Sequence, residues 1–270
     1  MVTSRACIVA LLVLLLPTLS WAQTDRLVIT GASSLAPLVQ EIATRFEQKH
    51  PSVRVEVQSG GTGRGITDAR RKLSQIGMVS RALKAEESDL IATTIAIDGV
   101  AIIVHSRNPI SNLTNTQIQD IYRGKVTNWQ QAGGTNQRIT VVNKADGRST
   151  LEVFSEYFTL PAREIRAHAV IGDNQQGIKQ VAGNPGAIGY VSIGAAQFEV
   201  LQGTPIKLLP LNKVPATIEN VAKGRFPMSR PLNLVTSGKP THLATRFIEF
   251  ATSSAVDDLI TGQYLVPPAR

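Results

Sequence analysis

Three short segments rich in glycine, serine and threonine are the parts of this sequence best suited to bind a ligand. They are residues 31–34 (Gly-Ala-Ser-Ser), 59–65 (Ser-Gly-Gly-Thr-Gly-Arg-Gly) and 146–150 (Asp-Gly-Arg-Ser-Thr). Each lies between a predicted strand and a predicted helix, so each offers backbone N–H groups at a helix N-terminus together with hydroxyl donors. These donors indicate an anion as the ligand.

Arginine could add fixed positive charge to such a site. Arg148 stands beside the hydroxyls of Ser149 and Thr150, and a guanidinium can hold an oxyanion with two parallel hydrogen bonds. Ser80 and Arg81 follow another apolar run. Taken singly, each of these segments also has a purely structural interpretation, as a helix cap, a tight turn or a surface arginine.

Nucleotide binding and catalysis have weaker support. Residues 59–65 lack the Gly-Lys-Ser/Thr ending of a nucleotide-binding P-loop and do not match the dinucleotide spacing. Residues 31–35 miss the Gly-x-Ser-x-Gly turn of serine hydrolases, because Leu35 takes the place of the last glycine. The four histidines lie in no recognisable motif. We therefore expect a protein that is not an enzyme, with a serine hydrolase whose triad assembles only in space as the remote alternative.

Neither a metal nor a cofactor is expected. The sequence has no His-x-x-x-His pair and no acidic calcium-binding loop. Its single cysteine, Cys7, lies in an N-terminal leader, so the chain without that leader has no thiolate ligand to offer.

The leader is predicted at residues 1–22. Arg5 precedes a small and apolar run over residues 6–16, and Ser-Trp-Ala at residues 20–22 places small side chains where a signal peptidase acts. We predict cleavage after Ala22 and export to the periplasm. A permanent membrane helix is the weaker interpretation, because the run is about half of the roughly 20 residues that a span needs.

The charge of the chain favours anionic ligands, although not nucleic acid. The formal net charge is +8, which attracts anions. The basic residues are scattered, and aromatic residues make up only 5% of the sequence, so a platform for stacking bases is poorly supplied. We therefore expect no nucleic-acid partner.

Predicted strands and helices alternate along the chain. Apolar residues at helical spacing predict a helix over residues 35–49, and alternating valines predict a strand over residues 53–57. Further strands are predicted at residues 27–30, 95–105, 139–142, 187–191, 206–209 and 232–236, and further helices at residues 62–73, 114–122, 150–158, 175–181, 242–252 and 255–260. This alternation indicates an α/β fold with mainly parallel sheets flanked by helices.

The domain organisation is predicted from the lack of any internal linker. Two lobes joined by extended crossing strands need none. We place lobe 1 at residues 23–105 plus 232–270 and lobe 2 at residues 106–231. The strand that ends at His105 and the strand over residues 232–235 are the expected crossings.

Taken in order, these motifs resemble the periplasmic phosphate-binding proteins of phosphate ABC transporters, which belong to the type II periplasmic binding protein superfamily. The segments that carry the resemblance are residues 31–37, 59–63, 77–83, 108–114, 121–129, 146–150 and 185–190. They follow the family's own order and span most of the chain after the leader.

The resemblance implies two lobes that close over one ion in the cleft between them, without covalent chemistry. It implies a solute-binding protein, expected to be a monomer, that captures inorganic phosphate and docks on a membrane ABC permease. The ligand-binding residues that follow from it and from the loops are Ser33, Ser34, Gly61, Thr62, Ser80, Arg81, Arg148, Ser149 and Thr150.

Two departures from the family pattern bear on the ligand. Many phosphate binders carry an aspartate where Arg81 stands, and that carboxylate accepts the proton of monohydrogen phosphate, which sulfate lacks. Arginine accepts no hydrogen bond, so the candidate replacements are Asp98, Asp146 and Asp173. The third loop has Gly-Arg-Ser-Thr-Leu at residues 147–151 in place of Gly-Ser-Gly-Thr-Arg. Another tetrahedral oxyanion (sulfate, molybdate or tungstate) and a phosphate-sensing role remain alternatives.

Overall fold

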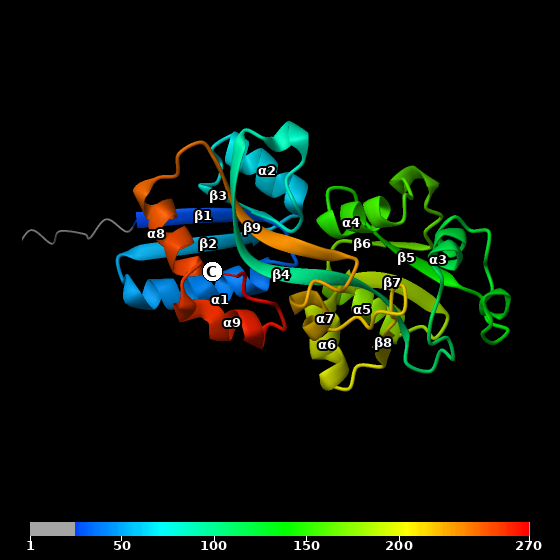
Figure 1. Cartoon of the computed structure of the whole chain (residues 1–270). Coiled ribbons are helices and arrows are strands. Elements are labelled where there is room, and N and C mark those ends of the chain that lie inside the picture. The colour runs from blue at the N-terminus through cyan, green and yellow to red at the C-terminus, as the bar shows by residue number, and fades with distance from the viewer. Residues whose placement is uncertain (1–24, 270) are drawn as a thin grey trace, which may run out of the picture.

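The chain forms two lobes that lie side by side and are joined by two long strands (Figure 1). The computed structural model describes residues 25–269, so the predicted leader and its cleavage point lie outside the described residues. No helix within this range is long and apolar enough to cross a membrane. The predicted α/β fold with two lobes is confirmed.

The first lobe is built on three parallel strands whose ends meet at one edge. Gly31, at the end of the central strand, pairs with Ser59 on one side and Met78 on the other. The loops that follow the three strands therefore begin close together. The elements of this lobe are β1 (Asp25–Gly31), α1 (Ala36–Lys49), β2 (Val53–Ser59), α2 (Thr62–Arg70), β3 (Ile76–Val79), α8 (His242–Ala251) and α9 (Asp257–Gly262).

Two antiparallel strands run from one lobe into the other: β4 (Leu90–His105) and β9 (Ser229–Ser237). Residues 90–99 of β4 pair with β9, whereas residues 100–105 pair with strands of the second lobe. Asp98 and Arg230 lie directly opposite each other in the β4–β9 ladder. The connection between the lobes is therefore sheet, which needs no flexible linker.

The second lobe covers its own sheet with helices on both sides (Figure 1). Its strands are β5 (Thr140–Lys144), β6 (Ala169–Ile171), β7 (Ala187–Ser192) and β8 (Ile206–Leu208). Its helices are α3 (Asn115–Tyr122), α4 (Ser149–Tyr157), α5 (Asn174–Ala182), α6 (Ile193–Leu201) and α7 (Ile218–Ala222). Strand β5 pairs in parallel with β6 and β7. Within residues 25–269, every antiparallel pair of these strands involves β4 or β9. Short 3-10 helices occupy Ala85–Glu87, Trp129–Ala132, Ala162–Glu164 and Ser254–Val256.

Each lobe has its own hydrophobic core, and the second core holds α4 in place. The rings of Phe154 and Tyr190 stack with their centroids 4.1 Å apart. Both side chains are buried, and burial of a large apolar side chain stabilises a fold by about 1.5–3 kcal/mol. The hydroxyl of Tyr190 donates to Asn143 Oδ1 at 2.5 Å. This packing fixes the start of α4, which carries the third glycine-rich loop.

Most predicted elements are present, with ends that differ by a few residues. The helix predicted over residues 62–73 ends at Arg70, and the strand predicted from residue 95 begins at Leu90. Strands β3 and β6 and helices α6 and α7 were not predicted. Helix α6 (Ile-Gly-Ala-Ala-Gln-Phe-Glu-Val-Leu) has apolar or small residues on most sides and still exposes Phe198 and Leu201, so its sequence shows no clear helical period.

We predict that Gly31→Ala lowers the free energy of unfolding by about 2–4 kcal/mol. Gly31 has a φ of +139°, and a Cβ at this position would lie 2.3 Å from the carbonyl oxygen of Met78. The matched control is Gly238→Ala, at a φ of +72° with nothing within 4 Å of an added Cβ, which should cost about 1 kcal/mol. Urea denaturation of both variants measures the difference, and equal losses would contradict this account of Gly31.

Candidate functional site

Four hydroxyl groups from four separate loops meet between the lobes. Ser34 Oγ donates to Ser80 Oγ at 2.9 Å, and Ser80 Oγ lies 2.5 Å from Ser149 Oγ. The backbone N–H of Ser80 donates to Thr62 Oγ1 at 3.3 Å. Thr62, Ser80 and Ser149 are buried and Ser34 is half-buried. These four residues are named the hydroxyl cluster below.

The sheet of the first lobe explains why three of these residues lie together. Ser34, Thr62 and Ser80 follow β1, β2 and β3, whose carboxyl ends share one edge of the sheet. Ligand sites of open α/β sheets form at that edge. Ser149 begins α4 in the second lobe, so the hydroxyl cluster joins the two lobes.

Gly61 permits the close approach of the second and third loops. It has a φ of +98°, and a Cβ here would lie 2.8 Å from the carbonyl oxygen of Gly147 and 3.1 Å from Arg148 Cδ. The N–H of the nearby Gly63 donates to that same Gly147 carbonyl oxygen at 3.2 Å. Gly61 therefore contributes to the site through its backbone, which lets the second and third loops approach each other.

Arg148 lies between the second loop and the turn that precedes α5. A Cβ on Gly61 would be 3.4 Å from Arg148 Nε, and a Cβ on Gly172 would be 3.5 Å from its Nη2. The side chain is half-buried. Its guanidinium group thus lies between Gly172 and the second loop, which also carries Thr62 of the hydroxyl cluster.

A buried ion pair lies next to the cluster, on the two crossing strands. Arg230 donates from Nε and Nη2 to Asp98 Oδ2 at 3.2 and 2.8 Å, and both side chains are 1% exposed. Arg230 Nη1 also donates to Thr150 Oγ1 at 3.0 Å. Ser192 Oγ donates to Asp98 Oδ1 at 2.9 Å. Thr150 and Ser192 are both at helix N-termini of the second lobe, so the pair connects the crossing strands to that lobe.

Arg81 is engaged by carboxylates on both lobes. It makes a two-pronged pair with Glu87, in which Nη1 and Nη2 each donate at 2.7 Å, and its Nε donates to Glu152 of α4. Burial alone would lower the pKa of Arg81, but the two carboxylates outweigh this effect and raise it above its usual value. Lys84 Nζ also lies 3.6 Å from Glu152. Arg81 thus links the lobes on one side of the hydroxyl cluster, and its guanidinium points to carboxylates.

Lys144, the last residue of β5, is a buried cation behind the third loop. Its side chain is 3% exposed, and Nζ donates to the backbone oxygen of Asp173 at 2.6 Å and to Asn174 Oδ1 at 3.2 Å. Burial and, to a smaller extent, the positive charges of Arg230 and Arg148 together lower the pKa of Lys144 to about 7, against the opposing effect of Asp173.

The three candidate carboxylates have different surroundings. Asp98 is buried and accepts hydrogen bonds from Arg230 and Ser192. Asp146 is exposed at the tip of the third loop. Asp173 accepts from the backbone N–H of Gln176 through Oδ1 and so caps α5.

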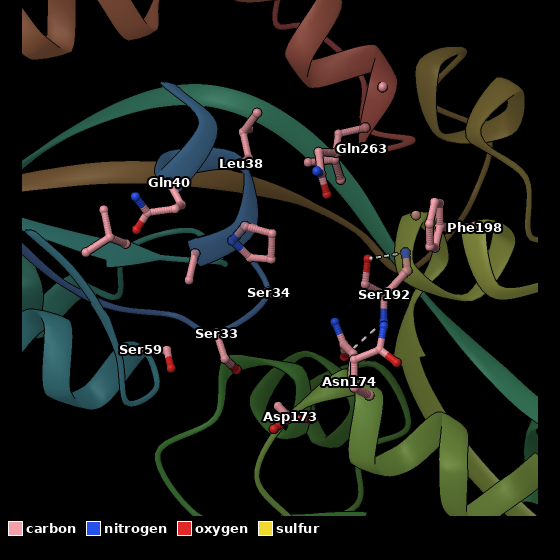
Figure 2. A pocket seen from close by; sticks show the side chains of 18 residues that line it. Ser33, Ser34, Leu38, Gln40, Ser59, Asp173, Asn174, Ser192, Phe198 and Gln263 are labelled. Carbon is pink, nitrogen blue, oxygen red and sulfur yellow. Dashed lines mark hydrogen bonds between the residues drawn. The ribbon is translucent and has the colours of Figure 1, made fainter. Parts of the chain in front are cut away.

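A cavity of about 580 Å³, the interlobe cavity, opens beside the hydroxyl cluster. Ser33 and Ser34 lie in its wall on the first lobe, and Asp173, Asn174 and Ser192 in its wall on the second. Figure 2 shows these side chains around the space between α1 and the starts of α5 and α6. Ser33 is thus placed at the cavity, next to the cluster and not within its hydrogen-bond network.

The arrangement is suited to holding an anion. Hydroxyl groups can turn their protons toward a negatively charged ligand, and cations in a partly buried site attract it strongly. Lys144, Arg148 and Arg230 supply positive charge, of which Arg230 is paired with Asp98. The side-chain partners of Ser80 Oγ are hydroxyl groups, so Ser80 is not paired with an imidazole base as a hydrolytic serine would be.

Two cations of the site were not predicted from the sequence: Arg230 and Lys144. Each had a weak signal, because each is a charged residue at the end of a strand with apolar residues. Arg230 precedes the apolar part of β9, and Lys144 lies two residues before the third loop. Neither position in the sequence indicates that the charged side chain points into the protein.

Comparison with known proteins identifies the wider group. A family model described as the PBP superfamily domain matches residues 19–255. The phosphate-binding protein PstS of Bacillus subtilis (strain 168) is 29% identical over 249 residues, which cover 89% of this chain and 80% of that protein.

Two solved structures share the fold at higher sequence identity. A substrate-binding protein from Clostridium perfringens, crystallised with bound phosphate, is 33% identical with a TM-score of 0.84, over 91% of this chain and 100% of that one. An ABC-type phosphate transport receptor from Vibrio cholerae is 32% identical with a TM-score of 0.75, over 90% of this chain and 100% of that one.

We predict that Lys144 makes stability depend on pH between about 7 and 10. The pKa of Lys144 is about 7 in the folded protein, whereas an unfolded lysine titrates near 10.4, so the folded state binds fewer protons in this interval. The contribution of this residue to the free energy of unfolding should therefore rise with pH, by at most about 1.4 kcal/mol per pH unit.

Urea denaturation of the ligand-free protein and of Lys144→Met at pH 6, 7, 8 and 9 measures this effect. Above pH 7, the free energy of unfolding of the wild type should increase relative to that of the variant. Lys179→Met, which removes an exposed lysine of α5, is the matched control. Parallel curves for the wild type and Lys144→Met would show that the Lys144 ammonium group does not lose its proton in this range.

Proposed function

The chain belongs to the PBP superfamily, and on this basis we propose that it is a solute-binding protein that captures inorganic phosphate for an ABC-type importer. The observation that carries the proposal is the hydroxyl cluster, in which donors from both lobes meet beside Arg148 and the Arg230–Asp98 pair. The phosphate named for the relatives, and bound in the Clostridium perfringens structure, supports this ligand.

Binding would exchange hydrogen bonds within the cluster for hydrogen bonds to the ion. The Ser34, Ser80 and Ser149 hydroxyls now satisfy one another, and each could turn its proton to an oxyanion at little cost. The N-termini of α1, α2 and α4 face the same region and favour negative charge. Because Ser149 and Arg148 come from the second lobe, the bound ion would favour the closed arrangement.

We propose different roles for the predicted site residues. Direct contacts are assigned to side chains of the hydroxyl cluster and to Arg148, with the backbone of Gly61 beside them. Thr150 would act with Arg230, and Ser33 from the cavity wall. Arg81 would act as a positioning residue, because its guanidinium already donates to Glu87 and Glu152.

The crossing strands β4 and β9 would serve as the hinge for closure. We propose the division into lobe 1 (residues 23–105 and 232–270) and lobe 2 (residues 106–231) on this basis, since the two strands carry the chain between two separate cores. Hinges of this type confine the change of backbone angles to a few residues.

Several properties of the whole protein follow as parts of the same proposal. The chain would be exported to the periplasm after cleavage behind Ala22, act as a monomer, and deliver its ligand to a membrane permease. It would bind no nucleic acid and catalyse no reaction. The relatives, which are named as binding proteins and transport receptors, support a role in transport.

Another tetrahedral oxyanion is the second candidate ligand, and one observation favours it. Both oxygens of Asp98 already accept hydrogen bonds, so this carboxylate does not face a ligand as a bare acceptor. A site that offered only donors would bind sulfate as readily as phosphate. Asp173, which faces the interlobe cavity beside Ser33, is the remaining candidate acceptor for a ligand proton.

We predict that Ser80→Ala and Arg148→Ala each weaken phosphate binding, by about 1–3 kcal/mol for the hydroxyl and about 2–5 kcal/mol for the guanidinium. Calorimetric titration with sodium phosphate measures the change. The matched controls are Ser155→Ala, whose hydroxyl has no hydrogen-bond partner among residues 25–269, and Arg138→Ala, which removes an exposed arginine. Unchanged affinity in both site variants would remove the hydroxyl cluster as the binding site.

We predict that Asp173→Asn narrows the preference for phosphate over sulfate. An ionised carboxylate accepts the proton of monohydrogen phosphate and repels sulfate, whereas an amide does neither to the same degree. Competition titrations of both anions against wild type and variant give the ratio of the two affinities. An unchanged ratio would assign the discrimination to another group. Tight sulfate binding by the wild type would favour the second candidate ligand.

A further inference from the structure

The interlobe cavity is larger than an inorganic oxyanion requires. Its volume is about 580 Å³. Five heavy atoms, at the roughly 30 Å³ that a water molecule occupies in the liquid, fill about 150 Å³. Most of the cavity would stay empty or hold water if phosphate were its only occupant. Pockets of about 300–1,000 Å³ are typical of sites for small organic ligands.

The cavity persists although the lobes are already in contact. Ser80 touches Ser149, the Gly63 N–H donates to Gly147, and Arg81 donates to Glu152, each pair reaching across from one lobe to the other. These contacts lie at the second and third loops, after β3 and in the first turn of α4. The cavity lies at the starts of α1, α5 and α6 (Figure 2). The space is therefore a separate part of the interface between the lobes.

The lining of the cavity combines carbon and amide groups, which a bare ion does not use. Pro37, Leu38 and Val57 give the first lobe an apolar wall, which Phe198 and Leu265 complete from other elements. Gln40, Gln175 and Gln263 also line the space, and the amide nitrogens of Gln175 and Gln263 donate to Glu199 and Glu41. Such a mixture suits a short carbon skeleton that carries hydroxyl groups, because amides both donate and accept hydrogen bonds.

The cavity adjoins the proposed anion site at one residue. Ser34 lines the cavity and also donates to Ser80 in the hydroxyl cluster. A ligand whose anionic head lies at the cluster would direct any substituent past Ser34 into the cavity. After the anion is placed, the remaining volume corresponds to roughly 14 heavy atoms at the packing of liquid water.

We infer that the protein also binds phosphate monoesters of small polyols, with the phosphoryl group at the hydroxyl cluster and the polyol in the interlobe cavity. This inference rests on the proposed function, because it uses the same anion site. The polyol would lie between the apolar wall of α1 and β2 and the first turn of α6, where Ala195 faces the space.

The experiment is calorimetric titration of the purified protein with inorganic phosphate and with sn-glycerol 3-phosphate. Both should bind to the wild type. Ala195→Phe, which fills the cavity from the second lobe, should weaken binding of the glycerol ester about tenfold or more and change that of inorganic phosphate less than about threefold. Ala36→Phe fills the cavity from α1 and serves as an independent second variant. Ala162→Phe, at an exposed position outside the cavity, is the matched control.

The outcomes separate this inference from the proposed function. Binding of inorganic phosphate without any binding of the glycerol ester would overturn the inference and leave the proposed function intact. Binding of both ligands, with equal effects of the filling and control variants, would place the polyol elsewhere and also overturn it. Failure of both ligands to bind would overturn the proposed function and the inference together.

Discussion

The ion pair between Asp98 and Arg230 is the constraint on which the arrangement of the lobes depends. Both side chains are 1% exposed, and a charge removed from water is costly unless its partner is well placed. The pair sits on opposite residues of β4 and β9, so it is compatible with one register of the crossing strands. Its outer hydrogen bonds go to Thr150 and Ser192, so that register also fixes where α4 and α6 begin.

The site that follows from this arrangement uses neutral donors at its centre and charges around it. The hydroxyls of the cluster face one another across the lobes, while Lys144, Arg148 and Arg230 stand behind or beside them. Donors from fixed loops and helix ends need little rearrangement when an anion arrives. Burial, with the nearby Arg230 and Arg148, lowers the pKa of Lys144 to about 7, so a charged Lys144 ammonium group is costly at this position.

The two sides of the interface between the lobes would have different roles in ligand binding. On the side of the second and third loops, polar contacts and the Arg81–Glu152 pair bring the lobes together. On the side of α1, α5 and α6, an apolar and amide-lined cavity separates them. One side would hold the charge of a ligand and the other would determine which substituents are admitted. A single fold can therefore keep one anion site while the cavity wall varies.

The sequence by itself determined the fold class, most of the elements and the loops of the site, because those properties are local. Periodicity shows which segments are strands or helices, and glycine with serine or threonine between a strand and a helix marks an anion-binding loop. Ser34, Thr62 and Ser149 were named from such local patterns, whereas Ser80 was named from the resemblance to the phosphate-binding family.

Only the tertiary structure decided which side chains turn toward one another. Arg81 looked like an anion ligand, yet its guanidinium is held by Glu87 and Glu152, which are 6 and 71 residues away in the chain. Arg230 and Lys144 enter the site because the crossing strands and the second core bring them there. Helix α6 forms without a clear period of its own, since its place is set by packing against β4 and the second lobe. Such contacts depend on register and packing between distant segments, which no local pattern encodes.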